Sequence, residues 1–125
     1  MTHKEIQNDL VERYRITLKQ HSDCYCRMHA HVRTRTVCKW IPANSVKATF
    51  ALMHEIGHIE TTKTWMRRAE EEYFATKWAL EKAREYGMDV PKKLAQTYQD
   101  YIDRELERGK RRGGTCYGDL NLFKG

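Results

Sequence analysis

The sequence predicts a single α+β domain in which a small antiparallel sheet packs against several helices. Apolar residues recur every third or fourth position over most of the chain, which is typical of amphipathic helices. Between about residues 24 and 41 the period changes to two, which is typical of half-buried strands. The length of 125 residues fits one domain and allows a core to form without staples.

The N-terminal third is predicted to form one helix and two strands. The helix covers about residues 4–19, and its apolar stripe consists of Ile6, Leu10, Tyr14 and Leu18. The strands cover residues 24–32 and 35–41, and Arg33-Thr34 is short enough to turn between them. One face of the first strand carries Cys24, Cys26, Met28, Ala30 and Val32, whereas the other carries Tyr25, Arg27, His29 and His31.

Three further helices are predicted after the strands. Asn44 or Ser45 caps the first, which continues to about residue 58. The second covers about residues 64–86 and is closed by Gly87. Pro91 suits the first turn of the third. The apolar stripe of this last helix consists of Leu94, Tyr98, Ile102 and Leu106.

Composition and charge narrow the classes of protein to be considered. Hydrophobic residues make up 40% and charged residues 32% of the chain, which is a globular balance rather than a disordered one. The net charge is +6, and much of the excess lies in a C-terminal segment from about residue 104. This segment is either a solvated helix end or a flexible basic tail that attracts nucleic acid. We favour the helix end, within a single domain of residues 1–125.

Nothing in the sequence indicates a membrane protein. No run of about 18 apolar residues is present, and the first residues lack the apolar core of a signal peptide. We therefore expect a cytoplasmic location. The four cysteines would be free thiols or metal ligands in that compartment rather than disulfides.

The segment His54-Glu55-Ile56-Gly57-His58 carries the chemistry of the chain. Two histidines at positions i and i+4 lie on one face of a helix, where their imidazoles can take two corners of a tetrahedral zinc ion. Glu55 lies at the flank of that face and can accept a proton from water that the metal activates. His54 and His58 are therefore the predicted metal ligands, and Glu55 is the predicted general base.

A catalytic zinc needs a third protein ligand and one open coordination position. The candidates are Glu70, Glu71 and Glu72, at the start of the following helix. An acidic run at a helix start is also favourable for its own sake, because it complements the helix dipole. We still expect one of the three to face inward, and Glu71 is the main competitor of Glu72.

Packing favours Glu72 among these acids. Ala75 and Ala79 share its helix face, and two small side chains would let this helix approach Gly57 closely. Thr76 follows Glu72 by four residues, and its hydroxyl could orient a carboxylate or an imidazole at the metal.

Two other groups of residues are candidates for a functional role. Cys24 and Cys26 lie near His29 and His31, but the period of two places the cysteines and the histidines on opposite faces. We therefore favour core cysteines over a second metal site. A tyrosine could supply a hydroxyl to the transition state, and the candidates are Tyr73, Tyr98 and Tyr101.

Two segments together resemble the ImmA/IrrE family of metallopeptidases: Phe-Ala-Leu-Met-His-Glu-Ile-Gly-His, at 50–58, and Glu-Tyr-Phe-Ala-Thr-Lys-Trp-Ala, at 72–79. The family follows His-Glu-x-x-His with Glu-x-x-Ala-(Asn or Asp)-x-Phe-Ala. Thr76 stands where the family has Asn or Asp, and Trp78 stands where it has Phe. The resemblance implies a zincin-like core and a cytosolic zinc peptidase that acts on a repressor, as members do on phages, mobile elements and stress regulons.

The sequence thus predicts a zinc-dependent metallopeptidase that hydrolyses a peptide bond in a protein or peptide substrate. The alternative is a zinc-containing protein without catalysis that docks a regulator or nucleic acid through its basic C-terminal helix. An intact Glu55 favours the enzyme, because metal binding alone does not require it.

Overall fold

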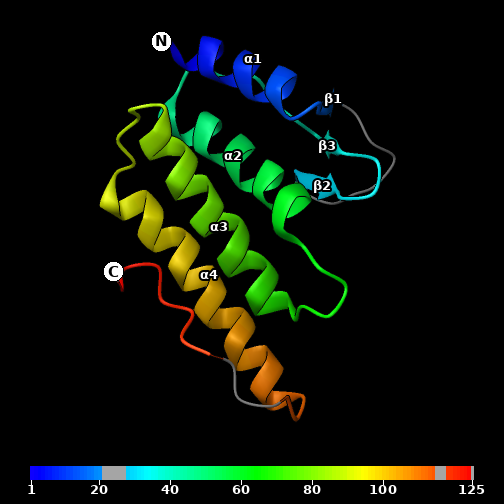
Figure 1. The fold of residues 1–125 in the computed structure, drawn as a ribbon. Helices are drawn as coiled ribbons and strands as arrows, with labels where there is room; N and C mark the ends of the chain where they lie inside the picture. Colours follow the sequence, from blue (N-terminus) through cyan, green and yellow to red (C-terminus); the bar gives the residue numbers. More distant parts are fainter. Residues whose placement is uncertain (21–27, 115–117, 125) are drawn as a thin grey trace.

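The computed structural model describes residues 1–20, 28–114 and 118–124, which form four helices and one three-stranded sheet (Figure 1). The predicted α+β class is confirmed. In chain order the elements are α1 (His3–Arg13), β1 (Thr17–Lys19), β2 (His29–His31), β3 (Thr36–Cys38), α2 (Val46–Thr61), α3 (Arg68–Glu85) and α4 (Lys92–Arg111). Helices α2, α3 and α4 lie side by side, and α1 and the sheet both contact α2.

Helix α1 is shorter than predicted, and a strand that the sequence did not indicate follows it. The helix starts at a capping box between Thr2 and Glu5 and ends at Arg13. Arg15 has a φ of 53°, which turns the chain out of the helix. The prediction to residue 19 was wrong because Leu18 of β1 packs on the same core as the helix stripe, which made the stripe look continuous.

The sheet is mixed, so the predicted antiparallel sheet is corrected. Its strand order is β1-β3-β2, with β1 parallel and β2 antiparallel to the central β3. The antiparallel pairing of the two predicted strands is present, but β1 adds a parallel neighbour on the other side of β3. Both predicted strands are also longer than β2 and β3, and residues 21–27 lie outside the described part of the chain.

Helices α2 and α3 form the most extensive contact between any two elements. Ser45 caps α2, because its hydroxyl oxygen accepts a hydrogen bond of 3.1 Å from the amide of Ala48. A Cβ added at Gly57 would lie 2.4 Å from the carbonyl oxygen of Ala75 on α3. The glycine therefore permits an approach of the two backbones that an alanine would prevent.

Helix α4 packs against α3 and carries the basic segment on its last turns. Pro91 occupies its N-cap position, one residue before the first helical turn where it was expected. The basic stretch that starts at Arg104 is helical as far as Arg111, and Gly113 follows with a φ of 77°. No helix within the described ranges is long and apolar enough to cross a membrane.

One arginine connects the hairpin to two helices. Arg35, in the turn between β2 and β3, has a φ of 51°. Its guanidinium donates hydrogen bonds of 2.7 and 3.2 Å to the carbonyl oxygen of Tyr14, just after α1. The same group forms an ion pair with Glu60 in the last turn of α2. The tip of the hairpin is therefore fixed against the ends of both helices.

Candidate metal centre

His54 and His58 lie one turn apart on the face of α2 that contacts α3. The two imidazole rings point toward each other, and their Nε2 atoms lie 3.2 Å apart. Their rings meet nearly edge to face, with centroids 4.7 Å apart. His54 is buried and His58 is partly buried, and both line a cleft.

Glu72 on α3 completes a triangle with the two histidines. Its Oε2 lies 3.0 Å from Nε2 of His54 and 3.1 Å from Nε2 of His58. Ligand atoms that surround a tetrahedral zinc at about 2.0–2.1 Å lie about 3.3 Å apart, so the triangle has nearly the size that such an ion requires. The three side chains lie close enough together to hold a metal ion.

Thr76 sets the orientation of His54. Its hydroxyl donates a hydrogen bond of 2.8 Å to the carbonyl oxygen of Glu72, so its oxygen is free to accept one. Nδ1 of His54 lies 3.0 Å from that oxygen and is the donor. The neutral imidazole therefore carries its proton on Nδ1 and directs the lone pair of Nε2 at the centre of the triangle.

Arg68 is a contributor that the sequence analysis missed. Its guanidinium lies 3.4 Å from Oε1 of Glu72, the oxygen that does not face the histidines, and 3.4 Å from the hydroxyl of Tyr101. The arginine thus orients the carboxylate from its outer side. The spacing of four residues between Arg68 and Glu72 was the available signal, because such residues are neighbours on a helix.

The two competing acids lie elsewhere. Glu71 is at the edge of the cleft and is only partly buried, with a distant ion pair of 3.9 Å to Arg68. Glu70 lies in the first turn of α3, where its carboxylate accepts a hydrogen bond from the amide of Arg67. Of the three acids, the structure brings Glu72 to the histidines.

Burial and mutual contact shift the pKa values of the three clustered residues. Burial lowers the pKa of His54, which favours the neutral form that metals bind. At His58, burial also acts to lower the pKa, but the hydrogen bond and charge of Glu72 outweigh it and raise the value. Burial acts to raise the pKa of Glu72, yet the hydrogen bonds and charges of both histidines hold it well below its usual range. Glu72 is therefore a carboxylate at neutral pH.

Glu55 lies beside the triangle, in a cleft of about 730 Å³. Its Oε1 is 4.0 Å from Nε2 of His54, so the carboxylate is adjacent to the triangle without being part of it. The cleft is lined by side chains of α2, α3, α4 and the segment around β2. Burial raises the pKa of Glu55 to about 7, which places it near the value that suits a group that both accepts and returns a proton at neutral pH.

Two of the three candidate tyrosines line the same cleft. Tyr98 lies with its ring centroid 4.8 Å from that of His54, and burial raises its pKa to about 12, so it stays a hydrogen-bond donor. Tyr101 lies nearby and contacts Arg68. Tyr73 packs instead against the small apolar cluster of Ala69, Ile102 and Leu120. Tyr98 and Tyr101 therefore remain as candidates.

Comparison of the chain with family models, with curated proteins and with solved structures gave no match.

Proposed function

We propose that the chain is a zinc-dependent metallopeptidase with its active centre at His54, His58 and Glu72. The observation that carries this proposal is the triangle of ligand atoms, with sides of 3.0 to 3.2 Å, beside a buried carboxylate in a cleft. The triangle alone would support any metal-binding role. Glu55 adds the proton acceptor that hydrolysis requires and that metal binding does not.

The donor set fits zinc. Two neutral imidazoles and one carboxylate are the ligands of one class of catalytic zinc sites, which keep a fourth position open for water or substrate. The three ligands and Glu55 all line the same cleft, which gives water or substrate access to them. Thr76 behind His54 and Arg68 behind Glu72 hold the ligands in place, as outer contacts do in metal sites generally.

The residues that line the metal centre have distinct roles in the proposed reaction. When bound, the metal supplies Lewis acidity that activates water and polarises a carbonyl group. Glu55 accepts the proton of the attacking water on its carboxylate and then donates it to the departing amine. Tyr98 or Tyr101, which both line the cleft, donates a hydrogen bond to the charge that develops on the carbonyl oxygen.

The edge of the sheet offers a place for a peptide. Among the described residues β2 pairs with β3 alone, and Met28, Ala30 and Val32 line the cleft. An extended peptide can add to such an edge through main-chain hydrogen bonds, which would lay it across the metal centre. This supports a protein or peptide substrate. On the basis of the resemblance to the ImmA/IrrE family, we further propose that the substrate is a cytoplasmic repressor protein of a phage or mobile element.

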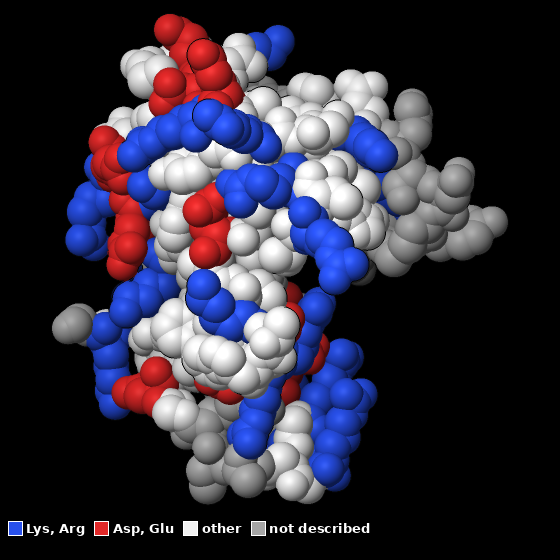
Figure 2. All heavy atoms as spheres, turned by 45° about the vertical axis from the view of Figure 1, so that its right-hand side comes forward, with Lys and Arg blue, Asp and Glu red and all other residues white. Residues whose placement is uncertain are grey.

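The basic end of α4 supports a second candidate function, which is docking of a regulator or nucleic acid without catalysis. Lys and Arg side chains gather at the lower right of this view, toward the end of α4, whereas acidic side chains are interspersed among them elsewhere on this face (Figure 2). A concentration of one charge at one end attracts acidic partners. It does not account for a buried glutamate beside the triangle, so we place this candidate second.

The substitution Glu55→Gln separates the two functions. We expect purified protein to contain about one zinc per chain at this centre, and Glu55→Gln to retain it. Cleavage of a synthetic peptide library, followed by mass spectrometry, should fall by about 100- to 10,000-fold. His54→Ala should lose both zinc and cleavage, whereas Glu81→Gln, at an exposed position of α3, should change neither. Full cleavage by the Glu55 variant would contradict the enzyme.

A further inference from the structure

The antiparallel pair β2–β3 brings together three side chains that can bind metal. His29 lies directly opposite Cys38 in the register of the two strands, and His31 lies opposite Thr36. Residues that are opposite each other, or two apart on one strand, share a face of the sheet. His29, His31 and Cys38 therefore share one face, whereas Ala30 and Val37 pack on the core from the other.

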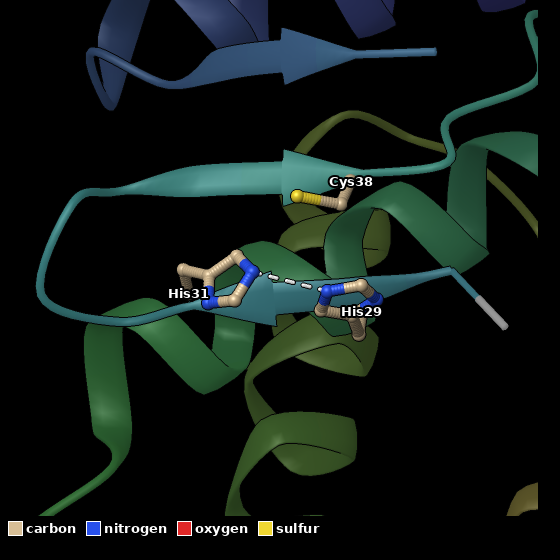
Figure 3. Close-up of side chains that lie close together, drawn as sticks. All are labelled: His29, His31 and Cys38. Atoms are coloured by element: carbon tan, nitrogen blue, oxygen red, sulfur yellow. Dashed lines mark hydrogen bonds between the residues drawn. The ribbon is translucent and has the colours of Figure 1, made fainter. Parts of the chain in front are cut away.

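The ligand atoms of these three residues converge. The Nε2 atoms of His29 and His31 lie 3.1 Å apart, and each residue offers a ligand atom within 4.8 Å of those of the other two. Figure 3 shows the two rings turned toward each other on β2, with the sulfur of Cys38 directed to the same side of the sheet from β3. Helix α2 lies behind the strands in this view, on the opposite face.

The histidine pair has the same geometry as the pair in the candidate metal centre. The ring centroids are 4.7 Å apart in both, with interplanar angles of 79° for His29–His31 and 89° for His54–His58. The separations of the Nε2 atoms, 3.1 and 3.2 Å, also agree. Two different backbones, a strand and a helix, thus present imidazoles in the arrangement that suits two corners of one coordination sphere.

We propose that His29, His31 and Cys38 form a second metal site that holds a zinc ion and ties the edge strand β2 to the central strand β3. Two imidazoles and one thiolate are zinc ligands at about 2.0–2.3 Å, and the sulfur makes this site distinct from the centre on α2 and α3. Binding converts the Cys38 thiol to a thiolate, and the proton passes to solvent.

A metal ion at this site would stabilise the pairing of two short strands. Both β2 and β3 comprise three residues, and pairs of strands this short have little stability of their own. A metal bound to residues of both strands would fix their register and the position of the edge that lines the cleft. Metal binding at this site does not depend on peptide hydrolysis at the other, so the two proposals can fail separately.

Cobalt(II) tests the site, because thiolate ligands give cobalt a charge-transfer absorption in the near ultraviolet that nitrogen and oxygen ligands do not. We expect the metal-free full chain, kept reduced with a phosphine, to bind two equivalents of cobalt, one of them with this absorption. Added zinc should remove the absorption. If no thiolate absorption develops, the second site does not exist, whatever the number of equivalents bound. A single equivalent that shows the absorption would instead contradict the centre on α2 and α3.

Variants identify the ligands. Cys38→Ser should abolish the thiolate absorption and leave one equivalent at the centre on α2 and α3, which also shows that the variant is folded. His31→Ala, at an exposed position, should weaken the absorbing site by at least about 100-fold without disturbing the core. Cys116→Ser is the matched thiol control and should keep both equivalents. Persistence of the absorption in Cys38→Ser would assign the sulfur to another cysteine and overturn the proposal.

Discussion

The two histidine clusters of this chain have nearly the same internal geometry but very different surroundings. At His54 and His58 the supporting elements are helices α2 and α3, with the most extensive contact in the fold. Hydrogen bonds and an ion pair behind the ligands hold them in place. At His29 and His31 the supporting elements are strands of three residues, and His31 is exposed.

The first site is ordered by helix packing before metal binds, whereas metal binding at the proposed second site would itself help to order the strands. The ligands on α2 and α3 are ordered by packing before any metal arrives, so little conformational entropy is lost on binding. Strands β2 and β3 comprise only three residues each, so metal binding there would be coupled to ordering of the edge strand β2. Changes to the helix packing should therefore affect the first site and spare the second.

Gly57→Ala should have the largest effect, because the added Cβ would lie 2.4 Å from the carbonyl oxygen of Ala75 and must force the helices apart. We expect the free energy of unfolding to fall by about 3 kcal/mol, the upper part of the range for overpacked sites. Metal affinity at the triangle should also fall, although no ligand is changed. Chemical denaturation and competition with a coloured chelator measure the two effects.

Gly118→Ala is the matched control for that change. A Cβ at Gly118 meets no atom of the described residues within 4 Å, so the stability of this variant should stay within about 0.5 kcal/mol of the parent chain. The cobalt–thiolate absorption of the hairpin site should survive in both glycine variants. Loss of that absorption in Gly57→Ala would show that the two sites are not independent.

Thr76→Val should have an intermediate effect. It keeps the shape of the side chain but removes the oxygen that accepts the hydrogen bond from Nδ1 of His54. A buried N–H without a partner costs about 1–3 kcal/mol, and loss of such an outer contact weakens metal binding by about 10- to 100-fold. Metal titrations should show this loss at the triangle alone. Thr76→Ser keeps the hydroxyl and should bind nearly as tightly as the parent chain.

Ser45→Ala should have the smallest effect. The variant loses the cap of α2, which is worth about 1 kcal/mol of stability. The cap lies more than two turns before His54, so the register between α2 and α3 should persist. Thermal unfolding should therefore shift while metal affinity at the triangle stays the same. A parallel loss of affinity would mean that helix stability, rather than helix packing, controls the first site.

The helical site was more accessible to sequence reasoning than the hairpin site, for a physical reason. On a helix the spacing i, i+4 fixes which side chains meet, so the pairing of His54 with His58 follows from the local pattern. Gly57 beside two alanines of the next helix also indicated a close approach, which the structure contains. Arg68 was overlooked because charged residues at a helix start are common and most of them face solvent.

Across strands, the neighbours depend on register, which the sequence does not state. The period of two correctly placed His29 and His31 on one face, but it could not show that Cys38 of another strand lies opposite His29. Cys24 and Cys26, which the period of two predicts to be core residues, lie outside the described part of the chain. The parallel strand β1 was missed for a related reason, since three residues are too few to show a period of two.

Arg35 restricts which residues the turn of the hairpin can accept. Glycine or asparagine would relieve the backbone at a φ of 51°, and at most turns of this kind they are favoured. Neither reaches both the carbonyl oxygen of Tyr14 and the carboxylate of Glu60, and lysine lacks the planar fork that serves two acceptors. If the residue at this position were chosen for its turn propensity alone, Arg35 would be replaced and the hairpin would lose its anchor to both helices. Consensus design at this position would work against the fold.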